Sequence, residues 1–304
     1  MADVPDHAPT RLVARQVTSD RAEHAEGPVW DVRAERLRWV DMLRGDLLSL
    51  DPDTVADEGT TVVAERRHVA DVLAALRPRV DGGWVAATEH GFAVTASDAD
   101  WTLTPVATVI DDPDVRMNEG GCDLAGGFVC GSMAYDQHTD GARLYRLAPD
   151  RTVSVVLDRV TISNGFCLDP TGRFAYYADT PTGRVDVFDV GDDGETLSGR
   201  RPFVVLEDGA GWPDGLTVDA DGGVWIALYR GAAVRRYATD GRLEAIVEVA
   251  TPHVTSCAFG GRDLDILFIT TTQENLDATA DRLAGALFAV RPGRIGLPPL
   301  PYRG

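Results

Sequence analysis

The chain has 304 residues, of which 44% are hydrophobic and 25% charged, and its 31 glycines and 17 prolines supply many turn positions. This composition predicts an ordered globular protein with a large core. No run reaches the roughly 18 to 20 apolar residues of a membrane span, and the N-terminal segment MADVPDHAPTRLV lacks the apolar core of a signal peptide. The net charge of −19 disfavours nucleic acids and anionic membranes as partners. We therefore expect a cytoplasmic protein that binds a small molecule or a cation.

One pattern recurs along the chain at intervals of roughly 40 to 50 residues. It consists of a polar residue, an apolar strand with an Asp at its end, a turn containing Gly, and a second apolar strand. The complete copies are EGPVWDVRAERLRWVD (26–41), NEGGCDLAGGFVCGSM (118–133), NGFCLDPTGRFAYYAD (164–179) and DGLTVDADGGVWIAL (214–228). Two degraded copies are LRPRVDGGWVAAT (76–88) and TSCAFGGRDLDILFITT (255–271).

Further strands are expected between the copies, in ARLYRLAP (142–149), GRVDVFDV (183–190) and AAVRRYATDG (232–241), where apolar and polar residues alternate as in half-buried strands. Turns of the D-x-x-G type are predicted at 123–126, 169–172 and 219–222. A repeat of this length fits one four-stranded propeller blade. The sequence therefore predicts an all-β six-bladed β-propeller, a single domain over 1–304 with a short N-terminal extension at about 1–18.

The first residue of each complete copy carries a side-chain oxygen. These residues are Glu26, Asn118, Asn164 and Asp214. Innermost strands line the central channel of a propeller, so equivalent positions converge on its axis. Singly, each residue would usually cap a turn or bind local backbone, but four of them at one repeat position favour a shared site. Such oxygen donors suit Ca²⁺, Mg²⁺ or Mn²⁺ and can hold Zn²⁺ or Fe²⁺, and a cation would offset the repulsion between the two carboxylates.

The cysteines and histidines form no recognisable catalytic or zinc-binding pattern. Cys122, Cys130, Cys167 and Cys257 lie in apolar runs without a CxxC pair, which favours buried reduced thiols. The six histidines are scattered, and the chain has neither HExxH nor GxSxG. A zinc protease or a serine hydrolase is therefore not expected.

Two further side chains are candidates for substrate contact by their chemistry. Arg116 lies two residues before Asn118, and a guanidinium offers fixed donors to sugar oxygens and to a developing oxyanion. Trp212 lies in the loop GAGWPDG, where it is expected at the mouth of a pocket, whereas Trp30 and Trp225 are expected in the core.

Several segments, in order along nearly the whole chain, resemble the motifs of the SMP-30/gluconolactonase/regucalcin-like family. They are AEGPVWD, RMNEGGCDLAGGFVCGSM, ISNGFCLDPTGRFAYYADTPTGRVDVFD, PDGLTVDADGGVWIALYRGAAVRRY and VTSCAFGG. The resemblance implies a six-bladed propeller with one divalent metal ion on its axis. It also implies hydrolysis of sugar lactones or related cyclic esters.

The resemblance also implies roles for individual residues. The family's metal ligands correspond to Glu26, Asn164 and Asp214. Its substrate contacts correspond to Arg116, Asn118 and Asp136. The chain departs from the family pattern at Glu119, where Asp is usual, and at Asp136, where Glu is frequent, so the identity of the substrate is left open.

These observations predict a metal-dependent lactonase. The metal would polarise the ester carbonyl of a small sugar lactone, and Asp214 would act as ligand and as general base toward water. We expect one divalent ion, with Ca²⁺ preferred over Zn²⁺, Mn²⁺, Mg²⁺ or Fe²⁺. The alternatives are a phosphotriesterase-like hydrolase on the same metal site and a noncatalytic metal-binding propeller. The lactone and the oligomeric state are not predicted.

Overall fold

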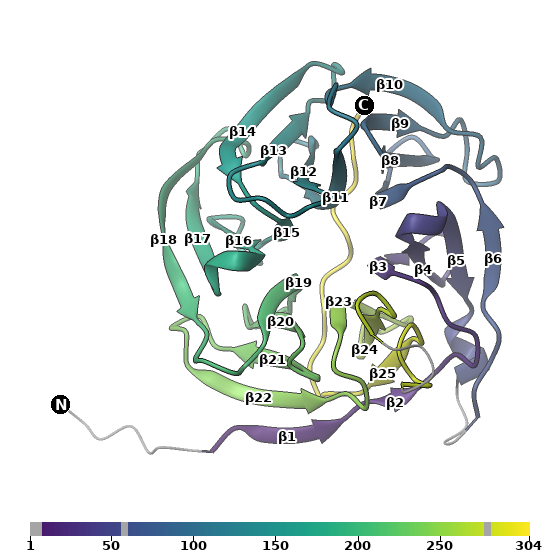
Figure 1. Cartoon of the computed structure of the whole chain (residues 1–304), viewed down its shortest axis with the longest axis vertical. Coiled ribbons are helices and arrows are strands. Elements are labelled where there is room, and N and C mark those ends of the chain that lie inside the picture. The colour runs from purple at the N-terminus through teal and green to yellow at the C-terminus, as the bar shows by residue number, and fades with distance from the viewer. Residues whose placement is uncertain (1–7, 56–59, 277–280) are drawn as a thin grey trace.

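Six β-sheets stand as blades around a central channel (Figure 1). The computed structural model describes residues 8–55, 60–276 and 281–304. Helical structure in these residues is limited to three short 3₁₀ helices, η1 (Met42–Arg44), η2 (Pro52–Val55) and η3 (Thr180–Thr182). The prediction of an all-β six-bladed β-propeller is confirmed.

Each blade contains four antiparallel strands that run in order from the channel outward. The inner strands are β3 (Ala25–Asp31), β7 (Leu73–Pro78), β11 (Val115–Cys122), β15 (Ser163–Leu168), β19 (Trp212–Val218) and β23 (Val254–Gly260). The second strands are β4 (Arg36–Asp41), β8 (Trp84–Thr88), β12 (Phe128–Ala134), β16 (Phe174–Asp179), β20 (Val224–Tyr229) and β24 (Ile266–Thr271). All six predicted copies of the repeat begin within an inner strand.

The outer half of each blade is less uniform than the inner half. The third strands are β5 (Asp46–Leu50), β9 (Gly91–Val94), β13 (Ala142–Leu147), β17 (Arg184–Val190), β21 (Ala233–Tyr237) and β25 (Phe288–Val290). The outer strands are β6 (Glu65–His68), β10 (Thr104–Thr108), β14 (Val153–Val160), β18 (Leu197–Val205), β22 (Leu243–Glu248) and β2 (Arg15–Gln16).

The segment near the N-terminus closes the ring. Strand β2 pairs with β25 and completes the sixth blade, while β1 (Thr10–Val13) adds a parallel fifth strand to the blade of β19 to β22. Residues 10–16, which the sequence places in an N-terminal extension, are thus paired with strands from the last third of the chain.

A bulge interrupts the pairing of each inner strand with its neighbour, close to the first residue of the repeat. In β11, β15 and β19 the bulge leaves Asn118, Asn164 and Asp214 outside the regular register. A bulge bends the strand and redirects the side chains on it, so these residues turn toward the channel. We call this end of the inner strands the head end, and the end that carries the D-x-x-G turns the turn end.

Glycine follows Asn164 and Asp214 because the inner strands of adjacent blades approach closely there. A Cβ atom on Gly165 would lie 2.9 Å from the carbonyl oxygen of Asp214, and one on Gly215 would lie 2.0 Å from Oγ of Ser256. Neither contact is compatible with a side chain. The Asn-Gly and Asp-Gly pairs in the sequence therefore encode the tight packing of strands around the channel.

The core lies between neighbouring blades, where apolar residues of facing sheets pack together. Trp39, Trp84 and Trp225 are among its largest fully buried side chains, and each contributes on the order of 3 kcal/mol by the transfer of apolar surface from water. Trp30 is also buried, so the packing roles predicted for Trp30 and Trp225 are confirmed. Cys122, Cys130 and Cys257 are buried free thiols, as expected, while Cys167 is partly exposed.

The three predicted D-x-x-G turns are present, with the amide of Gly126, Gly172 and Gly222 donating to the Asp carbonyl at the start of each turn. The prediction that the third strands are half-buried is wrong for β13 and β21, in which all residues but one are buried, while β17 is partly exposed at both ends. Their polar positions are satisfied by ion pairs instead of water, such as Arg146 with Asp123 across 2.5 Å.

The C-terminal segment, yellow in Figure 1, crosses the turn end of the channel. Its backbone binds four blades, since Ile295 and Gly296 pair with Ala220 and Leu264, and Tyr302 and Arg303 pair with Pro78 and Gly126. Residues 297–300 line a cavity of about 350 Å³ at this end, together with Arg77 and Glu119. The C-terminal segment thus connects these four blades across the turn end of the channel.

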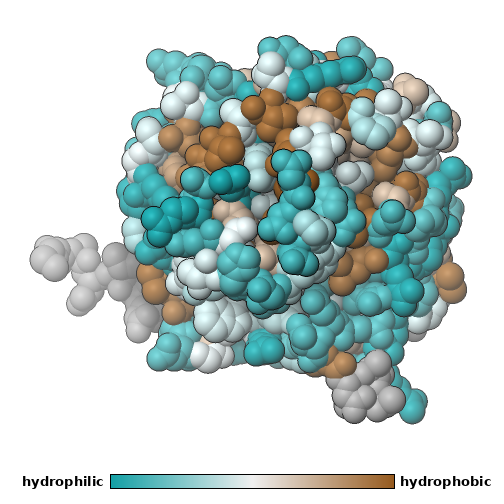
Figure 2. All heavy atoms as spheres, turned by 45° about the horizontal axis from the view of Figure 1, so that its top comes forward, coloured by the Kyte–Doolittle hydropathy of each residue, from teal (hydrophilic) through white to brown (hydrophobic). Residues whose placement is uncertain are grey.

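The surface reflects the acidic composition of the chain. In the view of Figure 2, hydrophilic residues cover most of the face, and hydrophobic residues form separate groups between them. In the described parts of the chain, no helix has the length and apolar character required to cross a bilayer.

Candidate metal centre and active site

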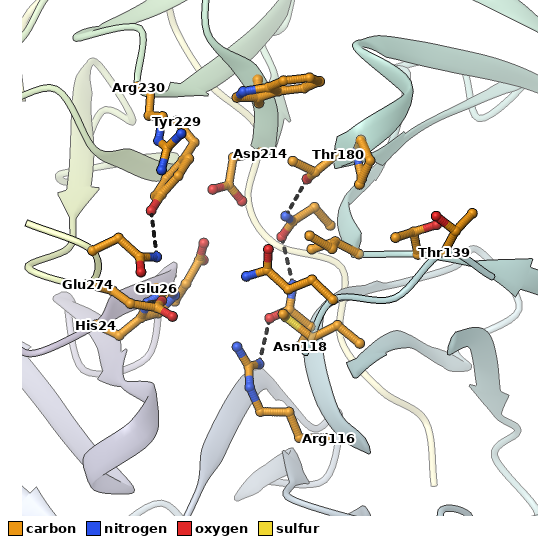
Figure 3. Close-up of a pocket in the computed structure, with 18 residues that line it drawn as sticks. His24, Glu26, Arg116, Asn118, Thr139, Thr180, Asp214, Tyr229, Arg230 and Glu274 are labelled. Carbon is orange, nitrogen blue, oxygen red and sulfur yellow. Dashed lines mark hydrogen bonds and ion pairs between the residues drawn. The ribbon is translucent and has the colours of Figure 1, made fainter. Parts of the chain in front are cut away.

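The head ends of the inner strands surround a pocket of about 370 Å³ (Figure 3). The predicted residues Glu26, Arg116, Asn118, Asn164 and Asp214 all line it. The other lining residues are His24, Met133, Gln137, Thr139, Thr161, Ile162, Thr180, Pro181, Trp212, Tyr229, Arg230, Glu274 and Asn275. The structure therefore brings together four repeat heads that are far apart in the sequence.

Carboxylates gather at the floor of this pocket. Glu26 and Asp214 are 2% and 7% exposed, and Glu119, the residue after Asn118, is 3% exposed. One carboxylate oxygen from each of these three residues lies within 4.8 Å of the other two. Oδ1 of Asp214 is buried without a hydrogen-bond partner in the described structure. Figure 3 shows the carboxylates of Glu26 and Asp214 turned toward the interior of the pocket.

Hydrogen bonds fix the two amide side chains of the site. Asn118 donates from Nδ2 to Oδ1 of Asn164 at 3.0 Å, and Asn164 donates from Nδ2 to Oγ1 of Thr180 at 2.7 Å. The hydroxyl of Thr180 in turn donates to the carbonyl of Pro213. Nδ2 of Asn164 faces the acceptor on Thr180, so the other end of the amide, Oδ1, faces Asn118 as an acceptor.

Arg116 lies beneath Asn118 and is 3% exposed. Its NH1 donates to Oδ1 of Asn118 at 2.7 Å and to the carbonyl of Met117 at 3.0 Å, while Nε is buried without a partner in the described structure. Burial lowers the pKa of this guanidinium, although the carboxylates nearby oppose the shift. A guanidinium stays protonated in proteins even when its pKa is lowered, so Arg116 places a positive charge beside the pocket.

The carboxylates of the floor are strained electrostatically when no cation is bound. Burial raises the pKa of Glu26 well above its usual value, and the charges of Glu119 and Asp214 raise it further. Burial and the charge of Glu119 likewise raise the pKa of Asp214. Burial raises the pKa of Glu119 to about 7, against the opposing effects of Arg77 and Ser256. The three carboxylates thus oppose one another's ionisation in a buried space of low dielectric constant.

This arrangement fits a divalent cation. A divalent ion would neutralise the mutual repulsion of the carboxylates, and it would give the unpartnered oxygen of Asp214 a bonding partner. The donors present are carboxylate and amide oxygens, which hard ions such as Ca²⁺, Mg²⁺ and Mn²⁺ prefer. The set of Glu26, Asn164 and Asp214 comes from three different blades, so an ion there would also connect them.

Asp136 is the one predicted site residue outside the pocket lining. Its side chain is 74% exposed and accepts a hydrogen bond from His138, although its neighbour Gln137 and the nearby Thr139 do line the pocket. A contact between Asp136 and substrate stays a prediction.

The structure adds a second polar wall that the sequence pattern did not reveal. His24 binds Glu274 through Nδ1 and Oε2 across 2.8 Å, and both side chains line the pocket. The hydrogen bond from His24 lowers the pKa of Glu274. His24 precedes Glu26 by two positions, and this spacing along a strand could have placed both on one side. Glu274 follows β24 in a loop and carries no comparable signal.

The rim of the pocket is aromatic and basic. Trp212 is 43% exposed and lines the pocket, as predicted. Arg230 lies over the ring of Tyr229 at 5.8 Å, and Tyr229 accepts a hydrogen bond from Asn275. These groups offer a stacking surface and donors at the entrance.

Fold and site together define a six-bladed propeller with a pocket on its axis that is lined by carboxylate and amide oxygens. Residues 24–273 match the model of the SMP-30/Gluconolactonase/LRE-like region. The chain therefore belongs to this family.

The chain is similar to regucalcin from Danio rerio, at 34% identity over 95% of this chain and 97% of the relative. It is also similar to pentonolactonase XacC from Haloferax volcanii, at 33% identity over 94% of this chain and 97% of the relative. Among solved structures, a calcium-binding protein described as regucalcin from Agrobacterium tumefaciens superposes with a TM-score of 0.89 at 25% identity, covering 98% of this chain and 100% of that one.

Proposed function

We propose that the protein is a metal-dependent hydrolase that opens sugar lactones, with a divalent ion held by Glu26, Asn164 and Asp214. The observation that carries the proposal is the convergence, in one pocket, of two buried carboxylates, an oriented amide oxygen and a buried guanidinium. Membership of a family that includes gluconolactonases supports the reaction class, as does the similarity to a pentonolactonase.

A bound divalent ion would supply Lewis acidity toward the ester carbonyl and would lower the pKa of water. The protein's own residues supply the remaining functions. Asp214 would accept the proton of the attacking water through the carboxylate oxygen that does not bind the ion. Its carboxylate needs the charge of the cation to stay ionised, since burial raises its pKa.

Arg116 and Asn118 would bind and orient the lactone. Arg116 has an unpartnered Nε, and Asn118 is held by hydrogen bonds to Arg116 and Asn164. A fixed cationic donor near the ester carbonyl would stabilise the negative charge that develops when water attacks. The exposed carboxylate of Asp136 is proposed to contact substrate at the mouth, next to the pocket residues Gln137 and Thr139.

We propose Ca²⁺ as the first choice of metal, because all donors are oxygens and a structure similar to this one is described as calcium-binding. Zn²⁺, Mn²⁺, Mg²⁺ and Fe²⁺ are the alternatives for the test.

The test is an assay of the metal-stripped and reconstituted protein on aldonolactones of five and six carbons, beside an organophosphate triester. Lactone hydrolysis that chelator abolishes and divalent metal restores is the expected result. Turnover of the triester alone would indicate a phosphotriesterase, and metal binding without turnover of either substrate would indicate a noncatalytic propeller. Full lactonase activity after verified metal removal would refute the metal dependence.

A further inference from the structure

The three proposed ligands leave a third buried carboxylate of the floor without a role. Glu119 lies on β11 beside Asn118 and is 3% exposed. Oε1 accepts a hydrogen bond from the hydroxyl of Ser256 at 3.1 Å. Oε2 is buried and has no hydrogen-bond partner in the described structure. An ionised carboxylate with an unpartnered buried oxygen is costly, and a cation is the usual compensation.

The direction from which Glu119 approaches differs from that of the other ligands. Glu26 and Asp214 line the pocket at the head end, whereas Glu119 lines the cavity at the turn end, with Arg77 and the C-terminal residues 297–300. Yet one oxygen of Glu119 lies within 4.8 Å of an oxygen of both other carboxylates. Oxygens bound to one Ca²⁺ at about 2.3 to 2.6 Å can be up to roughly 5 Å apart, so a single ion can contact all three.

Other partners do not account for Glu119. Among the described residues no ion pair within 4.0 Å involves Glu119, and Arg77, whose charge acts on Glu119 from nearby, donates its hydrogen bond to the carbonyl of Leu76. The guanidinium of Arg116 is engaged by Asn118 and by backbone. Even with the charges of Arg116 and Arg77 nearby, at least one negative charge of the three carboxylates is uncompensated when all are ionised, and a divalent ion would offset it.

From this geometry we infer that Glu119 is a fourth ligand of the metal ion, which it reaches from the turn-end side of the channel. The inference rests on the metal site of the proposed function. With Glu119 the ligands come from the first, third, fourth and fifth blades, and the ion is held from both ends of the channel. The longer side chain at this position, where the family usually has Asp, supplies the reach.

The experiment is calorimetric titration of metal-stripped protein with Ca²⁺, and separately with Mn²⁺. Wild-type protein is expected to bind one ion, Glu119→Gln to bind at least 10-fold more weakly, and Glu119→Asp to be weakened as well, because its carboxylate is one methylene shorter. A charge that acted only at a distance would persist in Glu119→Asp. Wild-type affinity of Glu119→Asp, or of Glu119→Gln, would therefore overturn the inference.

Asp123→Asn is the matched control, since Asp123 is a buried carboxylate on the same blade that pairs with Arg146 and faces away from the cluster. This variant is expected to lose stability but to keep the wild-type metal affinity. Glu119→Gln should keep at least the wild-type melting temperature without metal, because it removes a repelling charge. Absence of metal binding by wild-type protein would refute the proposed function as well, whereas normal wild-type binding with unchanged Glu119 variants would refute only the fourth ligand.

Discussion

Asp214 and Asp219 lie on one inner strand and the turn that follows it, and both are almost completely buried, yet their chemistry is opposite. Asp219 accepts hydrogen bonds from the amide of Gly223, the indole of Trp225 and the guanidinium of Arg236. Burial alone would raise its pKa, but these donors outweigh burial and lower it. Asp214 has an unpartnered oxygen, and its pKa is raised. Burial alone therefore does not distinguish the two carboxylates, and the missing partner makes Asp214 the better candidate for a functional role.

The largest expected effect is on catalysis at the head end. Asp214→Asn keeps the shape of the side chain but removes the charge and the proposed base. Turnover of lactone at saturating metal should fall by about 10² to 10⁴-fold, and metal should bind more weakly. The metal-free protein should be no less stable than wild type, because a repelling charge is lost. Steady-state kinetics and thermal unfolding measure these two results, and wild-type turnover would contradict the assignment.

The corresponding change at the turn end should affect stability instead. Asp219→Asn removes one of the two carboxylates that pair with the buried guanidinium of Arg236 and leaves only Glu244, which should cost about 3 kcal/mol of unfolding free energy. Metal affinity and turnover of the folded fraction should be unchanged. Denaturant unfolding with kinetics at low temperature checks this, and loss of metal binding with intact stability would reverse the roles of the two carboxylates.

A third variant separates substrate contact from metal binding within the pocket. Arg116→Ala leaves the proposed ligands in place but removes the charged donor to the ester. We expect kcat/KM to fall by about 10²-fold while Ca²⁺ affinity is not weakened. Calorimetry and kinetics on one preparation give both values. Loss of metal as severe as in Asp214→Asn would show that Arg116 belongs to the structure of the metal site.

The smallest expected effect is a pH dependence of stability. The pKa values of Glu26, Glu119 and Asp214 are raised in the metal-free fold, to about 7 for Glu119. Protonation of these groups therefore stabilises the fold. That stabilisation is complete below the ordinary carboxylate pKa and is lost as pH rises through the pKa values of the folded protein. A divalent ion removes the repulsion that appears at high pH. The rise in melting temperature on adding metal should therefore be larger at pH 8 than at pH 5, by a few degrees. Equal increments in calorimetric scans at the two pH values would argue against a carboxylate site.

The sequence predicts the propeller well because each blade repeats the same polar residue, strand and turn, and the period alone determines where the heads meet. Glu26, Asn118, Asn164 and Asp214 could be placed together for this reason. The burial of β13 could not be predicted, since alternation of polar residues does not distinguish water from an ion-pair partner such as Asp123.

Other parts of the site carry no periodic signal. Glu274 comes from a loop after β24, and its pairing with His24 depends on how the ring closes. Glu119 is adjacent in sequence to a pocket residue, but the bulge in β11 decides that it approaches the carboxylates from the opposite end of the channel. Local deviations from regular strand geometry, which one sequence does not specify, determine these positions.

The pairing of β2 with β25 has a consequence for the order in which the protein can form during synthesis. Residues 15–16 emerge from the ribosome long before their partners at 288–289. Blades made of consecutive segments can assemble as they appear, whereas the sixth blade needs two segments that are far apart in the sequence. Until residues 288–289 have been synthesised, the nascent protein has an open ring whose unpaired strand edges are exposed to chaperones and to other chains.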